Sequence, residues 1–167
     1  TWDLGSKLNQ ISKIKSITQG GVKTDIEYTA LTSTGNIYKS YYDTNPVLYP
    51  YANIKENVNF DVVSKLTQGA RKQEFRYRDF IGHFHGKGMV GFRQTARSTW
   101  YASGYENTKI WSGSEIDPTN EALPFKDWSI KTTDEDNIFP TDISLDNAQL
   151  LSFKQYEYKI DKLLNGT

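Results

Sequence analysis

"LTQGARKQEFRY", residues 66–77, repeats the plan of "ITQGGVKTDIEY", residues 17–28, 49 positions further along the chain. Each copy has an apolar residue, Thr-Gln-Gly, two variable residues, a lysine and then an apolar-x-Tyr pair. After each turn, apolar and charged residues alternate, which is typical of a strand with one buried face. Gly20 and Gly69 give the backbone the freedom that a tight hairpin turn needs. The repeat therefore predicts two β-hairpins, at about 8–30 and 58–80.

The strand before the first turn has an alternative interpretation. The apolar residues of "LNQISKIKSI" (8–17) recur about every third position, which also suits a short amphipathic helix. The match to "FDVVSKL" in the second copy favours an extended strand. Between the hairpins, residues 31–57 contain two prolines and many tyrosines, and we expect a loop that covers apolar surface.

The stretch "GKGMVGF" (86–92) has the glycine spacing of a dinucleotide-binding motif, at Gly86, Gly88 and Gly91. That motif must open a helix, whereas the β-forming sequence "FRQTARSTWYASGY" follows here. We therefore predict a glycine corner of the sheet, anchored by Phe92, followed by strands up to residue 112. A loop at 113–141 and a last hairpin at 142–160, with its turn at 146–149, complete a single all-β domain over residues 1–167. The fold class predicted is a set of antiparallel hairpins in a curved, twisted sheet with long irregular loops.

Composition excludes several classes of function. The 20 basic and 20 acidic residues balance, so the chain lacks the basic excess of a nucleic-acid-binding protein. It has no cysteine, which excludes disulfides and thiolate chemistry. No apolar run reaches the length of a membrane-spanning helix. The ends carry neither an initiating Met nor a signal peptide, and we expect a segment of a longer chain.

The candidate sites are few. His83 and His85 would share one face of a strand, but a zinc site needs three or four ligands, so we predict no metal. "TDEDN" lacks the spacing and glycine of a calcium loop. Acid–base chemistry would have to use Glu115, Asp117 or Glu121, which have the composition of an ordinary loop. No cofactor is expected, and the chain is predicted not to be an enzyme.

An alternative function is a carbohydrate- or protein-binding β module. It would use aromatic side chains as a stacking platform, although such residues more often fill a core. The candidates are Trp100, Tyr101, Tyr105, Trp111 and Trp128.

The order of these pieces resembles a known family. The stretches that carry the resemblance are, in order, "TDIEYTAL", "YPY" (49–51), "FDVVSKLTQG", "EFRYRDF", "HGKGMVGFR", "LPFKDW" and "LLSFKQYEY". They occur in the same order as in a segment shared by insecticidal toxin complex B components, Salmonella-type plasmid virulence B proteins and related Rhs/YD-repeat proteins. The family's Gly-Arg-Gly-Phe-Leu-Gly-Phe stretch corresponds to residues 86–92, with conservative replacements at Lys87, Met89 and Val90. The similarity covers about residues 4–160. The link at 104–140 is longer than in the family, and the fragment has no YD repeats.

The resemblance implies a structural role. Such a segment follows a β-propeller, leads into the Rhs repeats and forms part of a hollow β-shell around a toxic C-terminal domain, without catalytic residues of its own. The partners implied are the rest of the parent chain and a toxin-bearing region or subunit. The location implied is secreted or on the bacterial cell surface.

Overall fold

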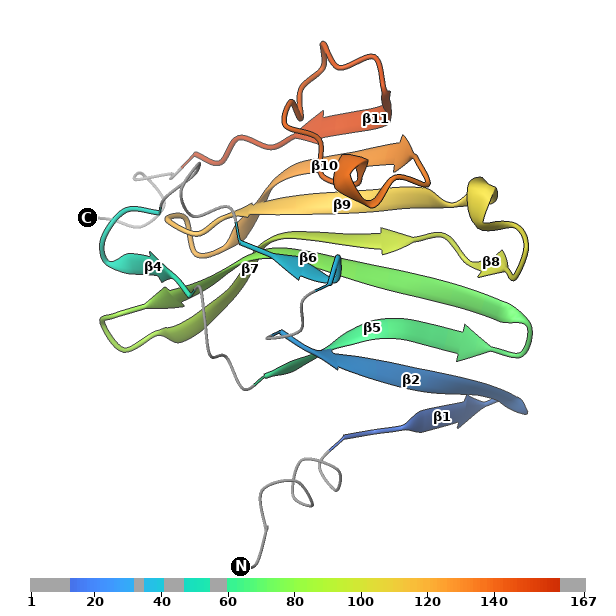
Figure 1. The fold of residues 1–167 in the computed structure, drawn as a ribbon. Coiled ribbons are helices and arrows are strands. Elements are labelled where there is room, and N and C mark those ends of the chain that lie inside the picture. Colours follow the sequence, from blue (N-terminus) through green and yellow to red (C-terminus); the bar gives the residue numbers. More distant parts are fainter. Residues whose placement is uncertain (1–12, 32–34, 41–46, 55–59, 160–167) are drawn as a thin grey trace, which may run out of the picture.

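The structure, a computed structural model, describes residues 13–31, 35–40, 47–54 and 60–159. These residues form one eleven-stranded, essentially antiparallel sheet with no α-helix, which confirms the predicted all-β class. Figure 1 shows the sheet from β1 at one end to β11 at the other. The order along it is β1-β2-β5-β6-β7-β9-β10-β11, while β3, β4 and β8 each pair with β6.

The two predicted hairpins are present. β1 (Ser16–Gln19) pairs with β2 (Val22–Ala30), and β5 (Asp61–Gln68) pairs with β6 (Arg71–His83). Each turn has two residues, and the glycines adopt positive φ: 57° at Gly20, 79° at Gly21 and 58° at Gly69. Residues 8–12, where a strand or a helix was expected, lie outside the described residues.

The remaining strands extend the sheet beyond β6. They are β7 (Gly88–Ser98), β8 (Tyr101–Ala102), β9 (Ile110–Asp117), β10 (Leu123–Lys131) and β11 (Leu150–Gln155). Within the predicted loop at 31–57, two short strands add to β6: β3 (Tyr38–Lys39), which is parallel to it, and β4 (Tyr51–Asn53). Two 3-10 turns occur, at Glu106–Thr108 and Glu135–Asn137.

The prediction of a loop over 113–141 is wrong for residues 113–117 and 123–131. Residues 113–117 complete β9, and 123–131 form β10, which pairs with both β9 and β11. The prolines at 118 and 124 made these residues look irregular. Pro118 begins the turn after β9, and Pro124 lies opposite Ile116 just before a shift in the register, where the loss of one backbone donor is tolerated.

The prediction of a last hairpin at 142–160 is also wrong. Over 142–159, the part of this range that the structure describes, β11 is the only strand, and its partner is β10. Residues 144–150 form two successive turns, in which Asn147 N–H donates to the Ser144 carbonyl at 3.3 Å and Leu150 N–H to the Asn147 carbonyl at 3.1 Å. The segment before these turns is not a strand. It packs against the sheet, and its residue Ile143 lies in the core.

One face of β6, β7, β9 and β10, here called the covered face, packs against residues 132–143. Its core contains Ala96, Trp111, Trp128, Ile130, Ile138, Phe139 and Ile143. Figure 1 shows the covering segment, with its 3-10 turn, crossing β9 and β10. Trp128 Nε1 donates to the Ile138 carbonyl at 3.2 Å, which satisfies the indole N–H inside the core.

The burial of β6 departs from its hydrophobic pattern. Arg76 and Arg78 lie on the covered face and are buried, whereas Phe75 and Tyr77 are half-buried on the opposite, open face. The Arg76 guanidinium binds both carboxylate oxygens of Glu135, at 2.6 and 2.8 Å, and lies over the Trp111 ring. Arg78 lies over Phe139, with its guanidinium carbon 4.4 Å from the ring centroid. Contacts with Glu135 and Phe139, which are distant in the sequence, therefore bury the arginine-bearing face of β6.

A second apolar cluster lies beyond Tyr77 on β6. The Phe92 ring contacts those of Tyr77 and Phe80, with centroids 4.7 and 5.0 Å away. Residues 77 and 80 would face opposite ways in a regular strand. Between them the buried Asp79 has a φ of 50°, and the pairing with β7 passes over it, which breaks the alternation. Ile37, Tyr38 and Ile54 pack here as well, so the connection between the hairpins does cover apolar surface.

Candidate functional site

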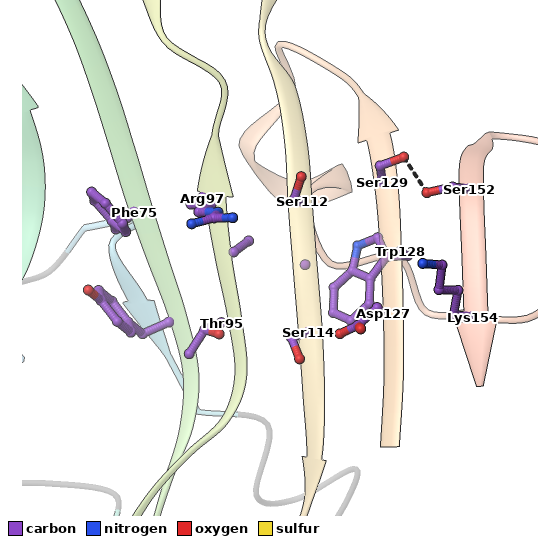
Figure 2. A pocket seen from close by; sticks show the side chains of 13 residues that line it. Phe75, Thr95, Arg97, Ser112, Ser114, Asp127, Trp128, Ser129, Ser152 and Lys154 are labelled. Atoms are coloured by element: carbon purple, nitrogen blue, oxygen red, sulfur yellow. Dashed lines mark hydrogen bonds between the residues drawn. The ribbon is translucent and has the colours of Figure 1, made fainter. Parts of the chain in front are cut away.

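A trough lies on the open face of the sheet. It has a volume of about 620 Å³ and crosses β6, β7, β9, β10 and β11. Figure 2 shows Phe75 at one end and Lys154 at the other, with hydroxyl side chains between them. We call this site the hydroxyl trough.

The strand register sets two rows of side chains across the trough, because directly opposed residues in a sheet share a face. The first row is Phe75, Arg97, Ser112, Ser129 and Ser152. The second row is Tyr77, Thr95, Ser114, Asp127 and Lys154. The site therefore has aromatic rings along β6, a floor of small hydroxyls, and charged groups on β7, β10 and β11.

Four polar side chains at the trough make hydrogen bonds within the protein. The hydroxyls of Ser129 and Ser152 lie 2.7 Å apart and hydrogen-bond to each other. Tyr156 donates its hydroxyl to Asp127 at 2.7 Å, and this hydrogen bond raises the pKa of Tyr156 above its ordinary value. Tyr77 donates to the Val63 carbonyl at 2.7 Å, and burial raises the pKa of Tyr77 to about 12, so it remains a neutral donor.

Sequence reasoning missed this site almost completely. Of the residues it singled out, only Trp128 belongs to the trough lining, and its side chain lies in the core. The signal was present as alternating polar pairs, Ser112-x-Ser114 and Asp127-x-Ser129, which share one face of a strand. The second pair fell within the stretch predicted to be a loop.

The aromatic platform of the alternative function does not form. Trp111, Trp128 and Tyr101 are only 1%, 2% and 7% exposed. Trp100 and Tyr105 are more accessible, at 37% and 62%. Three of the five candidates therefore serve the core, and the other two do not make up a stacking surface with them.

The glycine stretch forms the β6–β7 hairpin and a bulge. His83 pairs with Gly88 across a four-residue loop, and the register shifts between Ile81 and Gly82. Gly86, Gly88 and Gly91 have positive φ of 82°, 69° and 136°, and no atom lies within 4 Å of a Cβ built at any of them. Backbone conformation, and not close packing, requires these glycines.

The histidines next to this hairpin contact tyrosines. The Tyr49 hydroxyl hydrogen-bonds to Nε2 of His85, and the Tyr51 ring meets that of His83 edge-on at 4.8 Å between centroids. His83 Nδ1 accepts from the His85 backbone N–H at 3.1 Å. In the described part of the chain, no three His, Cys, Asp or Glu residues are grouped to hold a metal ion. That the histidine pair binds no metal stays a prediction.

Two of the three candidate acid–base residues have structural partners. Glu115 accepts a hydrogen bond from Gln94 Nε2 at 3.2 Å and pairs with Arg93 at 3.5 Å. Asp117 accepts from both the backbone N–H and the hydroxyl of Thr119, at 2.9 and 2.6 Å. Glu121 lies in the β9–β10 turn with a φ of 54°. The structure does not bring these carboxylates to the trough.

Comparisons with known proteins add no identity: no family model, no curated protein and no solved structure matches this chain. In the ranges that the structure describes, no helix is long and apolar enough to cross a membrane. The family resemblance therefore stays a prediction from the motifs quoted above.

Proposed function

We propose that this chain is a non-enzymatic structural segment of a large Rhs-type protein, in which its sheet continues into neighbouring strands of a shell around a toxic cargo domain. Its partners would be the rest of the parent chain and a toxin-bearing region or subunit. The protein would act after secretion or at the bacterial cell surface.

The observation that carries the proposal is the pair of unfilled sheet edges. Among the described residues, β1 pairs only with β2, and β11 pairs only with β10. An unpaired strand edge presents backbone donors and acceptors that another strand can engage. In a longer chain, two such edges would let adjacent strands extend the sheet in both directions.

The two faces of the sheet also suit a wall. The covered face is closed by the chain's own residues 132–143, so this face contributes to stability. The open face has small polar side chains over β9 and β10, which do not need a packing partner. The engagement of Glu115 and Asp117 in structural contacts favours a non-enzymatic role.

The outward amides of β11 can be identified. Tyr156 N–H donates to the Phe125 carbonyl at 3.0 Å, next to the paired residues Lys126 and Gln155. Because hydrogen-bonded and non-hydrogen-bonded pairs alternate in an antiparallel ladder, the N–H groups of Phe153 and Gln155 point away from β10. These two amides would bond to the next strand of the shell.

Hydrogen exchange tests this proposal. The amides of Phe153 and Gln155 should exchange rapidly in the 167-residue chain and become protected in the chain with its natural flanks. The amide of Lys154, which faces β10, is the internal control and should be protected in both. If the Gln155 amide exchanges equally fast in both chains, the edge is not continued and the wall proposal fails.

A second experiment addresses the cargo. In the parent chain, Gln155→Pro removes an outward donor without removing a bond to β10. We expect faster proteolysis of the enclosed C-terminal region, with Gln155→Thr, which keeps the N–H, as the matched control. Equal protection of that region in the two variants would contradict the role of this edge in the shell.

A further inference from the structure

The floor of the hydroxyl trough presents unused hydrogen-bonding groups. The hydroxyls of Thr95, Ser112 and Ser114 make no hydrogen bond to another residue in the ranges 13–31, 35–40, 47–54 and 60–159. A hydroxyl is both a donor and an acceptor. Adjacent strands in a sheet are about 4.8 Å apart, so the floor offers such groups at a regular spacing. This pattern fits a ligand that itself carries many hydroxyls.

The trough has two cationic side chains, Arg97 on β7 and Lys154 on β11. Lys154 is the cross-strand partner of Asp127, so its charge lies beside the trough's own carboxylate. Arg97 is exposed, and it forms no ion pair within the described part of the chain. Its guanidinium can bind a carboxylate through two parallel hydrogen bonds. The trough's own carboxylate, on Asp127, lies two strands away and accepts the Tyr156 hydroxyl. An acidic group of a ligand is therefore best accommodated at the Arg97 end.

An aromatic ring stands beside this cation. Phe75 is the cross-strand partner of Arg97 and is half-buried at the end of the first row. An accessible ring can pack against the apolar face of a sugar ring while the sugar hydroxyls reach polar neighbours. Three modes of contact therefore lie within two strand spacings: a cation on Arg97, an aromatic face on Phe75 and a hydroxyl on Ser112.

From this combination we propose that the hydroxyl trough binds an oligosaccharide that carries a carboxylate, with the acid group on Arg97, a sugar face on Phe75 and sugar hydroxyls on the Thr95, Ser112 and Ser114 floor. The trough volume of about 620 Å³ is within the usual range of ligand sites. An extended peptide is a poorer fit, because peptides that bind sheets use the backbone groups of an edge, whereas this site offers side-chain hydroxyls on a face. The proposal does not depend on the shell role.

Isothermal titration of the protein with three probes tests this inference. They are trigalacturonate, the corresponding neutral galactotriose, and hexaglutamate as an acidic peptide. We expect saturable one-to-one binding of trigalacturonate that is clearly tighter than binding of either other probe. Arg97→Gln should weaken it about tenfold or more, because a hydrogen bond to a charged group is lost.

Two further variants separate site effects from folding effects. Ser112→Leu places a bulky side chain on the exposed floor and should abolish binding, while the thermal unfolding midpoint stays near that of the parent. Lys131→Gln removes the same charge from an exposed position on β10 that is not part of the trough lining, and it should leave the affinity within about twofold. Figure 2 shows Arg97 and Ser112 on adjacent strands of the site.

The inference is overturned if trigalacturonate does not bind at millimolar concentrations, or if Arg97→Gln and Ser112→Leu bind it as the parent does. Equal affinity for galactotriose would remove the role given to the carboxylate and contradict the proposal. Tighter binding of hexaglutamate would assign the trough to an acidic peptide instead.

Discussion

The indole ring of Trp128 on β10 lies directly against the α-carbon of Gly113 on β9. The two residues are cross-strand partners, and a Cβ built on Gly113 would lie 2.1 Å from Cε2 of Trp128. Trp128 is 2% exposed, and its N–H is bonded to the Ile138 carbonyl. The ring is therefore held by its packing on Gly113 and by its hydrogen bond to the Ile138 carbonyl. Position 113 has no room for a side chain.

Gly113→Ala should consequently destabilise the protein, because either the Trp128 ring or strand β9 must move. We expect a loss of about 1–3 kcal/mol in the free energy of unfolding, measured by urea denaturation. Gly35→Ala is the control, since no atom lies within 4 Å of a Cβ at that position. If the two variants unfold at the same denaturant concentration, the close packing of Gly113 under the ring is refuted.

The β6–β7 hairpin gives a prediction about backbone conformation. Valine at Gly88 or Gly91 should cost about 1–3 kcal/mol, because both positions have positive φ. Asparagine should recover part of this loss at Gly88, whose φ of 69° is close to the left-handed helical region, but not at Gly91, whose φ is 136°. Lys87→Ala should have almost no effect. Denaturation midpoints of the five variants check the order, and equal costs for the two asparagine variants would contradict it.

The Phe92 ring anchors β7 on three other rings. It contacts Tyr77, Phe80 and Tyr38, the last at 6.1 Å between centroids. The side chain is half-buried, so Phe92→Ala should cost about 2 kcal/mol, below the range for a fully buried phenylalanine. Phe92→Leu should restore much of the loss.

Nucleotides give a test of the alternative, a phosphate-binding loop at residues 86–92. Addition of ATP or NAD should leave the denaturation midpoints of these variants unchanged. Stabilisation by a nucleotide that is lost in Lys87→Ala would support the phosphate-binding loop instead.

The ion pair between Arg76 and Glu135 joins the covering segment to β6. Burial alone would lower the pKa of Arg76, but the bonds and charge of Glu135, with Glu74 beside it, raise that pKa above its usual value. Glu135→Ala should cost about 2–4 kcal/mol, because it leaves a buried guanidinium without its bidentate partner. Asp136→Ala, at the next position, removes only an exposed contact to Lys39 and should leave the chemical denaturation midpoint unchanged. Similar losses of unfolding free energy in both variants would contradict a stabilising role for the Arg76–Glu135 ion pair.

Glu74 gives the fold a pH dependence. Burial tends to raise the pKa of this carboxyl, but the hydrogen bond from Lys109 at 2.9 Å and the charge of Arg76 outweigh it and lower the pKa below 4.5. A lowered folded-state pKa stabilises the protein above the unfolded-state value, and this stabilisation is lost as the pH falls through the folded-state value. Lys109→Met should therefore be less stable than the parent at neutral pH, and the difference should narrow on acidification below about pH 4.5. Urea titrations across this range check the prediction, and a constant difference at every pH would contradict it.

The local features of the fold were predictable from the sequence. Thr-Gln-Gly followed by alternating residues predicted both hairpins, because a two-residue turn and a period of two are set by neighbours along the chain. The glycines at 86, 88 and 91 lie in the β6–β7 hairpin and its bulge, where positive φ is likewise a local property of the backbone. Strand β10 was missed because its proline and acidic neighbours are typical of loops, and only pairing with β9 and β11 makes it a strand.

Tertiary structure alone decided which face of the sheet is buried and where the candidate site lies. In β6 the pattern favoured burial of Phe75 and Tyr77, yet Arg76 and Arg78 are the buried pair. A buried guanidinium is stable only with a partner, and Glu135 and Phe139 come from a segment about 60 residues further along the chain. That segment covers one face, and so it leaves the serines of β9 and β10 on the other face as the floor of the hydroxyl trough. The sequence determined the strands through local alternation and turns. Long-range pairing and side-chain burial decided which face of the sheet is buried and which is open.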